Sequence, residues 1–336
     1  MFLRGQVVID FRMAYVSANV VKNSHAVLSH TSACRSIPFG KKNNQLFSPQ
    51  ISNRCRSIHM MAETESLPKV DFLAASEYPS KFGTTLVIGG DRGLGLEMVK
   101  ALTNNGCKVI AAIRKDKPSA ELEAVNPHTV ITGADFMSDN VDEIICNGLT
   151  EPVDTVMMVS GYFTTETLDE FNREEEVKMF KICAISPGQI LTSMHKNKKF
   201  APNAKIGFIT SEGGSIGLRT EKEGGLNYGH HMSKASSNML GKLLAYDLKP
   251  FGISMVMIHP GFLRTDMTAD KYSHLWDELG AVTAATAVPY ILQCVADLSL
   301  ESTGRFVAAM GAHGLGLGIY AIEDPSKLVP GADLPW

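Results

Sequence analysis

Residues 84–95 read TTLVIGGDRGLG, and this stretch decides the fold of the chain. A short apolar run, typical of a buried strand, leads into glycines in the order G-x-x-x-G-x-G, and a helix with apolar spacing follows. Glycines at such a turn let the backbone N–H groups of the helix start approach a pyrophosphate, because no side chain holds the anion away. The pattern predicts a nucleotide-binding turn, the alternative being a purely structural one. The candidate binding residues are Gly89, Arg92, Gly93, Leu94 and Gly95.

Apolar strands alternate with helices from residue 84 onward. The sequence predicts strands at 85–89, 108–113, 129–132, 154–159, 206–210, 253–258 and 305–309, and helices at 94–105, 174–195, 232–248 and 281–298. Pro187 should kink the second of these helices, since proline removes a helical hydrogen bond. Apolar strands bounded by helices indicate a parallel sheet covered on both faces. Right-handed crossovers then predict a single doubly wound, Rossmann-type α/β domain over residues 84–336.

The composition is that of an ordinary globular protein. The chain has 336 residues, of which 44% are hydrophobic and 20% charged, and its net charge of −3 gives no reason to expect a nucleic acid as partner. No apolar run is long enough for a membrane span. The six cysteines are scattered without a C-x-x-C pair, so we expect neither a disulfide framework nor a metal site.

The first 62 residues differ from the rest. They are basic and rich in serine, and Asp10 is the only acid before residue 62. This composition is typical of a transit peptide, which would direct the protein to a mitochondrion or a chloroplast. The alternative is a leader that is disordered or not translated, with Met60 or Met61 as the start and the cytoplasm as the location. Residues 63–83 would form an N-terminal extension.

The end of the second predicted strand bears on the choice of nucleotide. An acidic residue there would bind the ribose hydroxyls of NAD, but the sequence continues with Arg114 and Lys115. Two cations suit a 2′-phosphate, and the guanidinium can bind it bidentately. We therefore expect NADP (NADPH) rather than NAD, with Arg92 as a possible helper, although the pair could also be a solvated surface feature.

Further motifs follow the glycine turn in a fixed order. Ala134–Asp135 comes after the third strand, I-T-S-x-x-G-S-I spans 209–216, M-S-K-A spans 232–235, and P-G-x-x-x-T-D-M spans 260–267. Together with the glycines they resemble the short-chain dehydrogenases/reductases, most closely the small carbonyl-reductase-like members called C-factor-like. The resemblance covers residues 84–309.

This resemblance implies NADP-dependent hydride transfer to a small carbonyl compound, that is an aldehyde, a ketone or a quinone. Ser211 would polarise the carbonyl, and Lys234 would hold the nicotinamide ribose. The remaining cofactor contacts would come from Asp135 at the adenine, from Gly161, and from Pro260, Gly261 and Thr265 at the nicotinamide. The resemblance also implies a homodimer or homotetramer formed through helices 174–195 and 232–248.

The chain departs from the family pattern at three places. The family's N-N-A-G is M-V-S-G at 158–161, its helix asparagine aligns with Cys183, and its tyrosine, four residues before the lysine, is His230. Cys183 reads more simply as a small core residue than as a group that holds a relay water.

His230 should point at the same pocket as Lys234, because residues four apart share a helix face. The lysine disfavours a second cation, so His230 should tend to be neutral, and a neutral imidazole is a weaker proton donor than a phenol. Protonated, it could still act near or below neutral pH. Tyr228 is a second candidate donor, but its phase on the helix fits a wall of the substrate pocket better. We expect His231 at the surface.

Three functions remain open at this stage. The first is a reductase with altered proton delivery. The second is an inactive NADP(H)-binding protein that serves as a scaffold, sensor or assembly factor. The third is a different reaction on the same fold, such as isomerisation or dehydration. Residues 262–280, with Tyr272 and Trp276, should cover the substrate side, unless these rings only pack their own helix.

Overall fold

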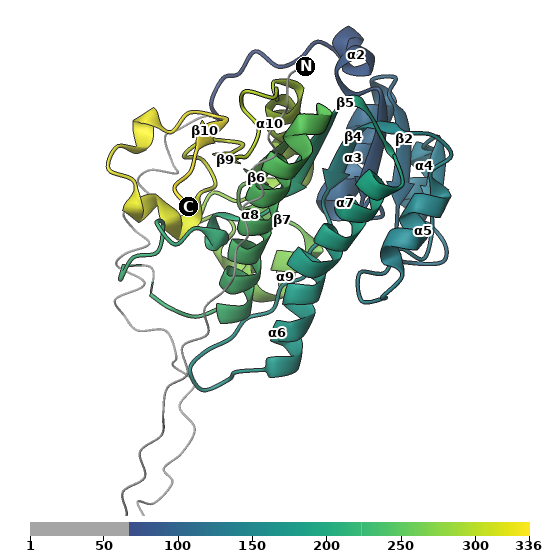
Figure 1. Ribbon diagram of the computed structural model, residues 1–336. Coiled ribbons are helices and arrows are strands. Elements are labelled where there is room, and N and C mark those ends of the chain that lie inside the picture. The colour runs from purple at the N-terminus through teal and green to yellow at the C-terminus, as the bar shows by residue number, and fades with distance from the viewer. Residues whose placement is uncertain (1–66, 223) are drawn as a thin grey trace, which may run out of the picture. The chain divides into compact units, whose positions relative to one another are not determined.

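An eight-stranded sheet forms the centre of the protein (Figure 1). The computed structural model describes residues 67–222 and 224–336, so the leader predicted for residues 1–62 lies outside the described residues. The strand order is β10-β9-β6-β5-β4-β1-β2-β3. Their bounds are β1 Thr84–Ile88, β2 Lys108–Ala112, β3 Thr129–Ile131, β4 Val153–Met158, β5 Phe200–Ile209, β6 Ser254–His259, β9 Arg305–Ala308 and β10 Ala332–Asp333.

The sheet is parallel except for β10, which pairs antiparallel with β9. From β1 the chain builds outward through β2 and β3, and it then returns to place β4 on the other side of β1. This reversal of strand order makes the carboxyl ends of β1 and β4 a topological switch point, which is where ligands bind in open α/β sheets. The predicted doubly wound α/β fold is confirmed.

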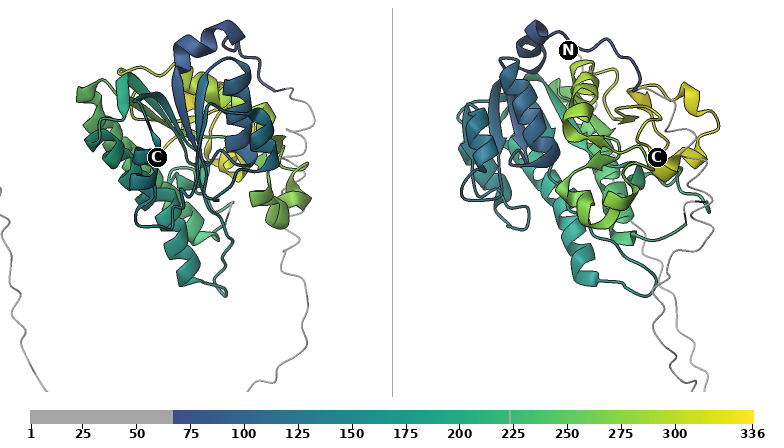
Figure 2. Two further views of the ribbon diagram at one scale, coloured as in Figure 1. Left: turned by 90° about the vertical axis from the view of Figure 1, so that its right-hand side faces the viewer. Right: turned by 180° about the vertical axis from the view of Figure 1, so that it is seen from behind.

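Helices cover both faces of the sheet (Figure 2). Their bounds are α2 Tyr78–Phe82, α3 Gly93–Asn104, α4 Ala120–Val125, α5 Val141–Gly148, α6 Arg173–Phe180, α7 Ser186–Lys196, α8 Tyr228–Leu248, α9 Asp266–Tyr272 and α10 Ala284–Ala296. Alternate residues of β1 enter separate cores: Leu86 and Ile88 pack with α5, α7 and α8, whereas Val87 packs with α3 and α10. This period of two is what a strand buried on both faces requires.

The predicted kink at Pro187 takes the form of a wider helical turn. A π-helical turn, η2 (Lys181–Ile185), lies between α6 and α7, so one helix runs through all three segments. Proline has no N–H to donate to the preceding turn, and a π turn absorbs the missing hydrogen bond.

Several small elements were not predicted. A two-stranded sheet pairs β7 (Leu263–Arg264) with β8 (Val282–Thr283), and together with α9 it lies in the segment that follows β6. The helix predicted at 281–298 corresponds to α10, which is shorter. It begins later because Thr283 caps it: the side chain of Thr283 accepts a hydrogen bond from the N–H of Thr286.

Residues 67–83 pack on α10 before they enter the sheet. The hydroxyl of Tyr290 donates to the carbonyl of Pro68 at 2.7 Å, and the N–H of Leu73 donates to the side chain of Gln293 at 2.9 Å. The ring of Phe72 contacts Tyr290 edge-on. No helix in residues 67–222 and 224–336 has the length and apolarity to span a bilayer.

Candidate active site

The glycine turn after β1 accepts no larger residue at two positions. Gly89 has φ 94°, and a Cβ there would lie 2.7 Å from the Oγ of Ser160. A Cβ on Gly95 would lie 2.1 Å from the carbonyl oxygen of Gly89. No side chain caps the N-terminus of α3, which begins at Gly93, so its first N–H groups remain available to an anion. The predicted nucleotide-binding residues therefore form a cradle with the chemistry of a phosphate site.

The two cations after β2 have different surroundings. The ammonium of Lys115 lies 3.2 Å from the carboxylate of Asp91, which also accepts the N–H of Ser119. Burial acts to raise the pKa of Asp91, but the hydrogen bonds from Ser119 and Lys115 outweigh it and lower the pKa below its ordinary value. Lys115 is thus engaged by the glycine turn. Arg114 is exposed and makes no ion pair within the described residues.

Two more predicted cofactor residues come from segments that follow strands of the sheet. Asp135 follows β3 and is half-buried, and its carboxylate accepts the N–H of Met137 at 2.9 Å. Thr265 comes from the loop after β6, and its Cγ2 lies 3.9 Å from the position of a Cβ on Gly93. The neighbouring Asp266 forms an exposed ion pair with Arg92, 3.9 Å between Nη1 and Oδ2. The loop after β6 therefore lies against the glycine turn.

Ser211 stands directly after β5, beside the first turns of α8. Its Oγ accepts the N–H of Gly213 at 3.0 Å. A Cβ on Gly214 would lie 2.5 Å from the backbone of Lys234, and one on Gly213 would lie 3.2 Å from the Nε2 of His230. These close approaches require small residues in the serine turn (211–214), and they bring it into contact with the helix that carries the other predicted catalytic residues.

Lys234 is buried where several segments meet. Its side chain is 8% exposed, and its Nζ lies 3.4 Å from the carbonyl of Ile209 at the end of β5. A Cβ on Gly161, after β4, would lie 3.8 Å from the same Nζ and 3.9 Å from Met267. The lysine thus lies between the carboxyl ends of β4 and β5 and the segment after β6.

His230 lies one turn before Lys234 on α8, and Tyr228 is the first residue of that helix. The ring of His230 is held edge-on by Phe163, 4.8 Å between centroids. Burial, and then the charge of Lys234, hold the pKa of His230 well below its ordinary value. The imidazole is therefore neutral at physiological pH. Its Nδ1 is buried and has no hydrogen-bond partner among the described residues.

Aromatic rings surround this histidine. Phe163 stacks on Tyr272 at 5.8 Å, and Phe262 meets Tyr272 edge-on at 6.3 Å. The hydroxyl of Tyr272 accepts a hydrogen bond from Asn227 at 3.1 Å, immediately before α8. The structure places Tyr272 beside His230 through Phe163. Trp276 instead donates to Thr268 within its own segment.

Cys183 lies in the π turn and is 1% exposed. Its Sγ contacts the carbonyl of Tyr162 at 3.6 Å, and its own carbonyl accepts the hydroxyl of Ser237 at 2.7 Å. Both contacts favour the reading of Cys183 as a small core residue.

His231 is a correction to the sequence analysis. It is half-buried rather than at the surface, and its Nε2 lies 3.4 Å from the Nη1 of Arg219. Burial, and then the charge of Arg219, lower its pKa. Arg219 also pairs with Glu212, the residue after Ser211, so it links His231 to the serine turn.

Sequence reasoning missed a pair of buried carboxyl groups beneath the start of α8. Glu166, 2% exposed, accepts the N–H of Gly229 at 2.7 Å. Glu176 is 9% exposed, and its pKa is raised by burial and by the charge and hydrogen bonding of Glu166. The run of three glutamates at 174–176 resembles a solvated helix start, so only the tertiary fold distinguishes Glu176.

His259 was also missed. It ends β6 and contacts the serine turn, as described below. In residues 67–222 and 224–336, no cluster of histidine, cysteine and acidic side chains could hold a metal ion.

The chain matches known proteins over most of these elements. The family profile described as short chain dehydrogenase matches residues 83–276. A curated relative is the 1-hydroxy-2-glutathionyl-2-methyl-3-butene dehydrogenase of Rhodococcus sp. (strain AD45), 30% identical over 226 residues, which are 66% of this chain and 95% of that protein. C-signal of Myxococcus xanthus is 29% identical over 170 residues, 50% of this chain and 95% of that protein.

Solved structures agree with the fold. The NADPH-bound carbonyl reductase from chicken fatty liver superposes with a TM-score of 0.60 at 21% identity, over 75% of this chain and 98% of that one. The family match spans the glycine turn, the serine turn and the start of the segment after β6. The chain therefore belongs to the short-chain dehydrogenase/reductase family, a family of oxidoreductases that typically use NAD(P).

Proposed function

We propose that the protein is an NADP-dependent reductase of a small carbonyl compound, an aldehyde, a ketone or a quinone, with altered proton delivery. The observation that carries the proposal is the meeting of three predicted catalytic residues beside a phosphate cradle. Ser211 lies in the turn after β5, His230 and Lys234 lie on α8, and Gly213 and Gly214 allow the turn to approach that helix closely. The glycine turn and the loop after β6 lie against each other at the same edge of the sheet.

The residues present fit the cofactor. The uncapped N–H groups at the start of α3 would bind the pyrophosphate. Arg114, which is exposed and has no ion pair with another described residue, would bind a 2′-phosphate. Asp135 would lie at the adenine. The nicotinamide and its ribose would be held by Gly161, Lys234, Pro260, Gly261 and Thr265. When bound, the cofactor supplies the hydride.

The protein's own groups act on the substrate oxygen. Ser211 would donate a hydrogen bond to the carbonyl and polarise it, and the ammonium of Lys234 would stabilise negative charge in the buried pocket. His230 has a low pKa, so at neutral pH it would offer a neutral N–H or, in a small fraction of molecules, a charged acid. Tyr228 would line the substrate side. Weak general-acid help makes turnover about 10²–10⁴-fold slower than with a well-tuned donor.

Titration calorimetry on the full chain tests the cofactor assignment. We expect NADPH to bind more tightly than NADH, because the guanidinium of Arg114 can form an ion pair with the 2′-phosphate. Gly95→Ala should weaken NADPH binding by about 10-fold or more, since its Cβ would displace the backbone of Gly89. Gly225→Ala is the control, because its Cβ would meet no atom within 4 Å. No binding of either nucleotide to the unaltered chain would contradict the proposal.

The second candidate is an NADP(H)-binding protein without catalytic activity, serving as a scaffold, sensor or assembly factor. Two observations favour it: the Nδ1 of the neutral His230 has no hydrogen-bond partner among the described residues, and Cys183 packs as a core residue. The two candidates differ in turnover: a reductase oxidises NADPH in the presence of a quinone such as menadione, and a scaffold binds NADPH without consuming it.

We also propose that residues 1–62 are a transit peptide and that residues 84–336 form one catalytic domain. The basic, acid-poor composition of the leader supports the first assignment. A fluorescent protein fused after residue 62 should enter a mitochondrion or a chloroplast. Diffuse cytoplasmic fluorescence would indicate a start at Met60 or Met61 instead.

A further inference from the structure

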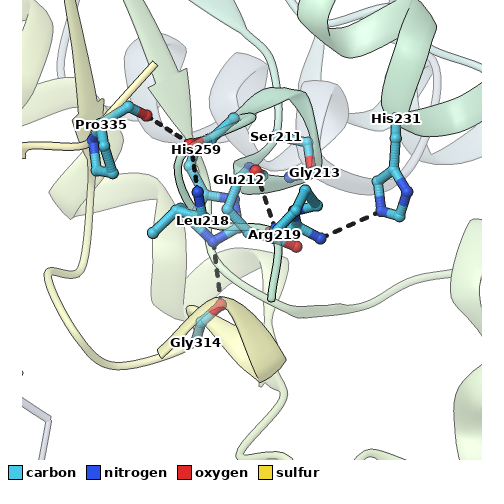
Figure 3. Close-up of polar contacts among 10 residues, drawn as sticks. Ser211, Glu212, Gly213, Leu218, Arg219, His231, His259, Gly314 and Pro335 are labelled. Atoms are coloured by element: carbon cyan, nitrogen blue, oxygen red, sulfur yellow. Dashed lines mark hydrogen bonds and ion pairs between the residues drawn. The ribbon is translucent and has the colours of Figure 1, made fainter. Parts of the chain in front are cut away.

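The side chain of His259 joins two backbone segments across the interior. The residue ends β6, and it is 5% exposed. Its Nδ1 accepts the N–H of Glu212 at 3.1 Å, and its Nε2 lies 3.0 Å from the carbonyl oxygen of Gly314 (Figure 3). The first partner can only donate and the second can only accept. Both hydrogen bonds therefore require the neutral tautomer with the proton on Nε2.

These two segments belong to the proposed site. Glu212 directly follows Ser211, whose Oγ is held within the same turn by the N–H of Gly213. Gly314 packs on the loop after β6: a Cβ on it would lie 3.0 Å from the nitrogen of Phe262 and 3.1 Å from the Cα of Gly261. A single imidazole thus contacts both the serine turn and the segment that packs on the loop predicted to contact the nicotinamide.

The residues that follow the serine turn are tied to the C-terminal segment. The hydroxyl of Ser215 donates to the carbonyl of Pro335 at 2.6 Å, and the N–H of Gly217 donates to the carbonyl of Trp336 at 2.9 Å. Neither contact involves Glu212. Glu212, at the Ser211 end of the turn, is tied to His259 through its N–H and to Arg219 through its carbonyl and carboxylate.

We infer that His259 is a positioning residue: its Nδ1 holds the serine turn, and with it Ser211, through the N–H of Glu212, while the carbonyl of Gly314 keeps the proton on Nε2. It touches no reacting atom. The inference rests on the proposed role of Ser211, but the contact itself can be tested without activity. A direct hydrogen bond to the residue beside a catalytic group fixes that group within the small tolerance that carbonyl activation requires.

Two substitutions separate the two hydrogen bonds. His259→Asn puts an amide oxygen near the position of Nδ1, so it keeps the acceptor for Glu212 and loses the donor to Gly314. His259→Gln reaches the position of Nε2, so it keeps the donor and loses the acceptor. Both change the same buried ring, so a purely structural role predicts the same effect on turnover from each. Ser215→Ala is the matched control at the other end of the turn.

The readouts are kcat and KM with NADPH and menadione, melting temperature, and amide hydrogen exchange of peptides that contain residues 211–214. We expect His259→Asn to keep kcat and the protection of these amides. His259→Gln should lower kcat by about 10-fold, the scale of one lost hydrogen bond, and should speed exchange in the serine turn. Ser215→Ala should leave the Glu212 amide protected.

Equal kcat and equal exchange in the two variants, at whatever melting temperature, would overturn the inference. If the unaltered chain binds NADPH but does not reduce menadione or a panel of other carbonyl compounds, the proposed function fails. The exchange comparison then still decides whether His259 holds the serine turn.

Discussion

The imidazole of His230 decides how the proposed reaction obtains its proton. Two causes act in the same direction, since burial and the positive charge of Lys234 both disfavour a charged imidazole. The sequence predicts the second cause from the spacing of four residues on one helix. The first cause comes from tertiary packing, in which Phe163 lies against the ring. Proton donation by a charged His230 is therefore confined to acidic solution.

Turnover should consequently rise as the pH falls. Above the lowered pKa of His230, each pH unit downward increases the protonated fraction about 10-fold, and so the rate that depends on it. We expect kcat for menadione to increase from pH 8 toward the lowest pH at which the protein stays folded. His128→Gln, at an exposed histidine outside the site, should leave this profile unchanged.

Replacing His230 with tyrosine tests the same assignment from the other side. A phenol beside Lys234 is the donor that the family pattern implies, so His230→Tyr should raise kcat at neutral pH by about 10²–10⁴-fold and remove the rise in acid. An unchanged or lower rate, with the acid profile retained, would show that the imidazole has a chemical role of its own.

Some helices and strands can be predicted from the sequence more closely than others. The strands from β1 to β6 could be predicted to within a few residues, apart from the early start of β5, because each is an apolar run bounded by helices. The two-residue strands β7, β8 and β10 could not, since they are too short to show alternation and depend on neighbours far along the chain. Pro187 indicated a kink, but only the structure shows the π turn. Within the candidate site, Ser211 and Lys234 could be predicted because each lies in a sequence motif.

The contacts that orient the site have no local signature. Glu166 lies in a loop, Glu176 in a run of surface-like acids, and His259 at the end of an apolar strand. Glu166 and His259 each accept a backbone N–H that is distant in sequence, and Glu176 interacts with Glu166; periodicity carries no information about such contacts. The start of α8 is the clearest case, because Glu166 accepts the N–H of Gly229, immediately before His230.

The buried pair of Glu166 and Glu176 should make the free energy of unfolding depend on pH. The folded-state pKa of Glu176 is raised, so its contribution is fully present below the unfolded-state pKa and is lost as the pH rises through the folded-state value. Glu176→Gln keeps a neutral side chain at every pH. Relative to the unaltered chain, this variant should melt about 2–4 °C higher near neutral pH, and the difference in melting temperature should shrink in acid.

Glu174→Gln, which changes an exposed neighbour on the same helix, is the control and should show no such trend. A lower melting temperature for Glu176→Gln at neutral pH would mean that the carboxylate itself is needed.

At the scale of the whole molecule, the sheet brings the segments of the proposed site together. The outer face of two helices remains exposed. The chain continues in opposite directions from the neighbouring strands β1 and β4, and α8 carries the proposed catalytic residues His230 and Lys234. The outer face of α8 and of the α6–α7 helix carries large apolar side chains that are more than half exposed: Val177, Ile185, Met239, Leu243 and Tyr246. Large exposed apolar side chains that gather on neighbouring helices are typical of an association face.

A second copy of the chain is the expected occupant, as the family resemblance implies for these helices. Met239, Leu243 and Tyr246 recur at intervals of four and three residues, so they lie along one face of α8, and a two-fold axis would pack that face against itself. Light scattering after gel filtration should give a dimer or tetramer for the unaltered chain and a monomer for Leu243→Glu, because a charge at the interface centre is left without a partner. Val329→Glu introduces the same charge at an exposed apolar residue outside this face and should leave the assembly intact. A monomeric unaltered chain would contradict the assignment, and the apolar face of α8 would then require a different partner.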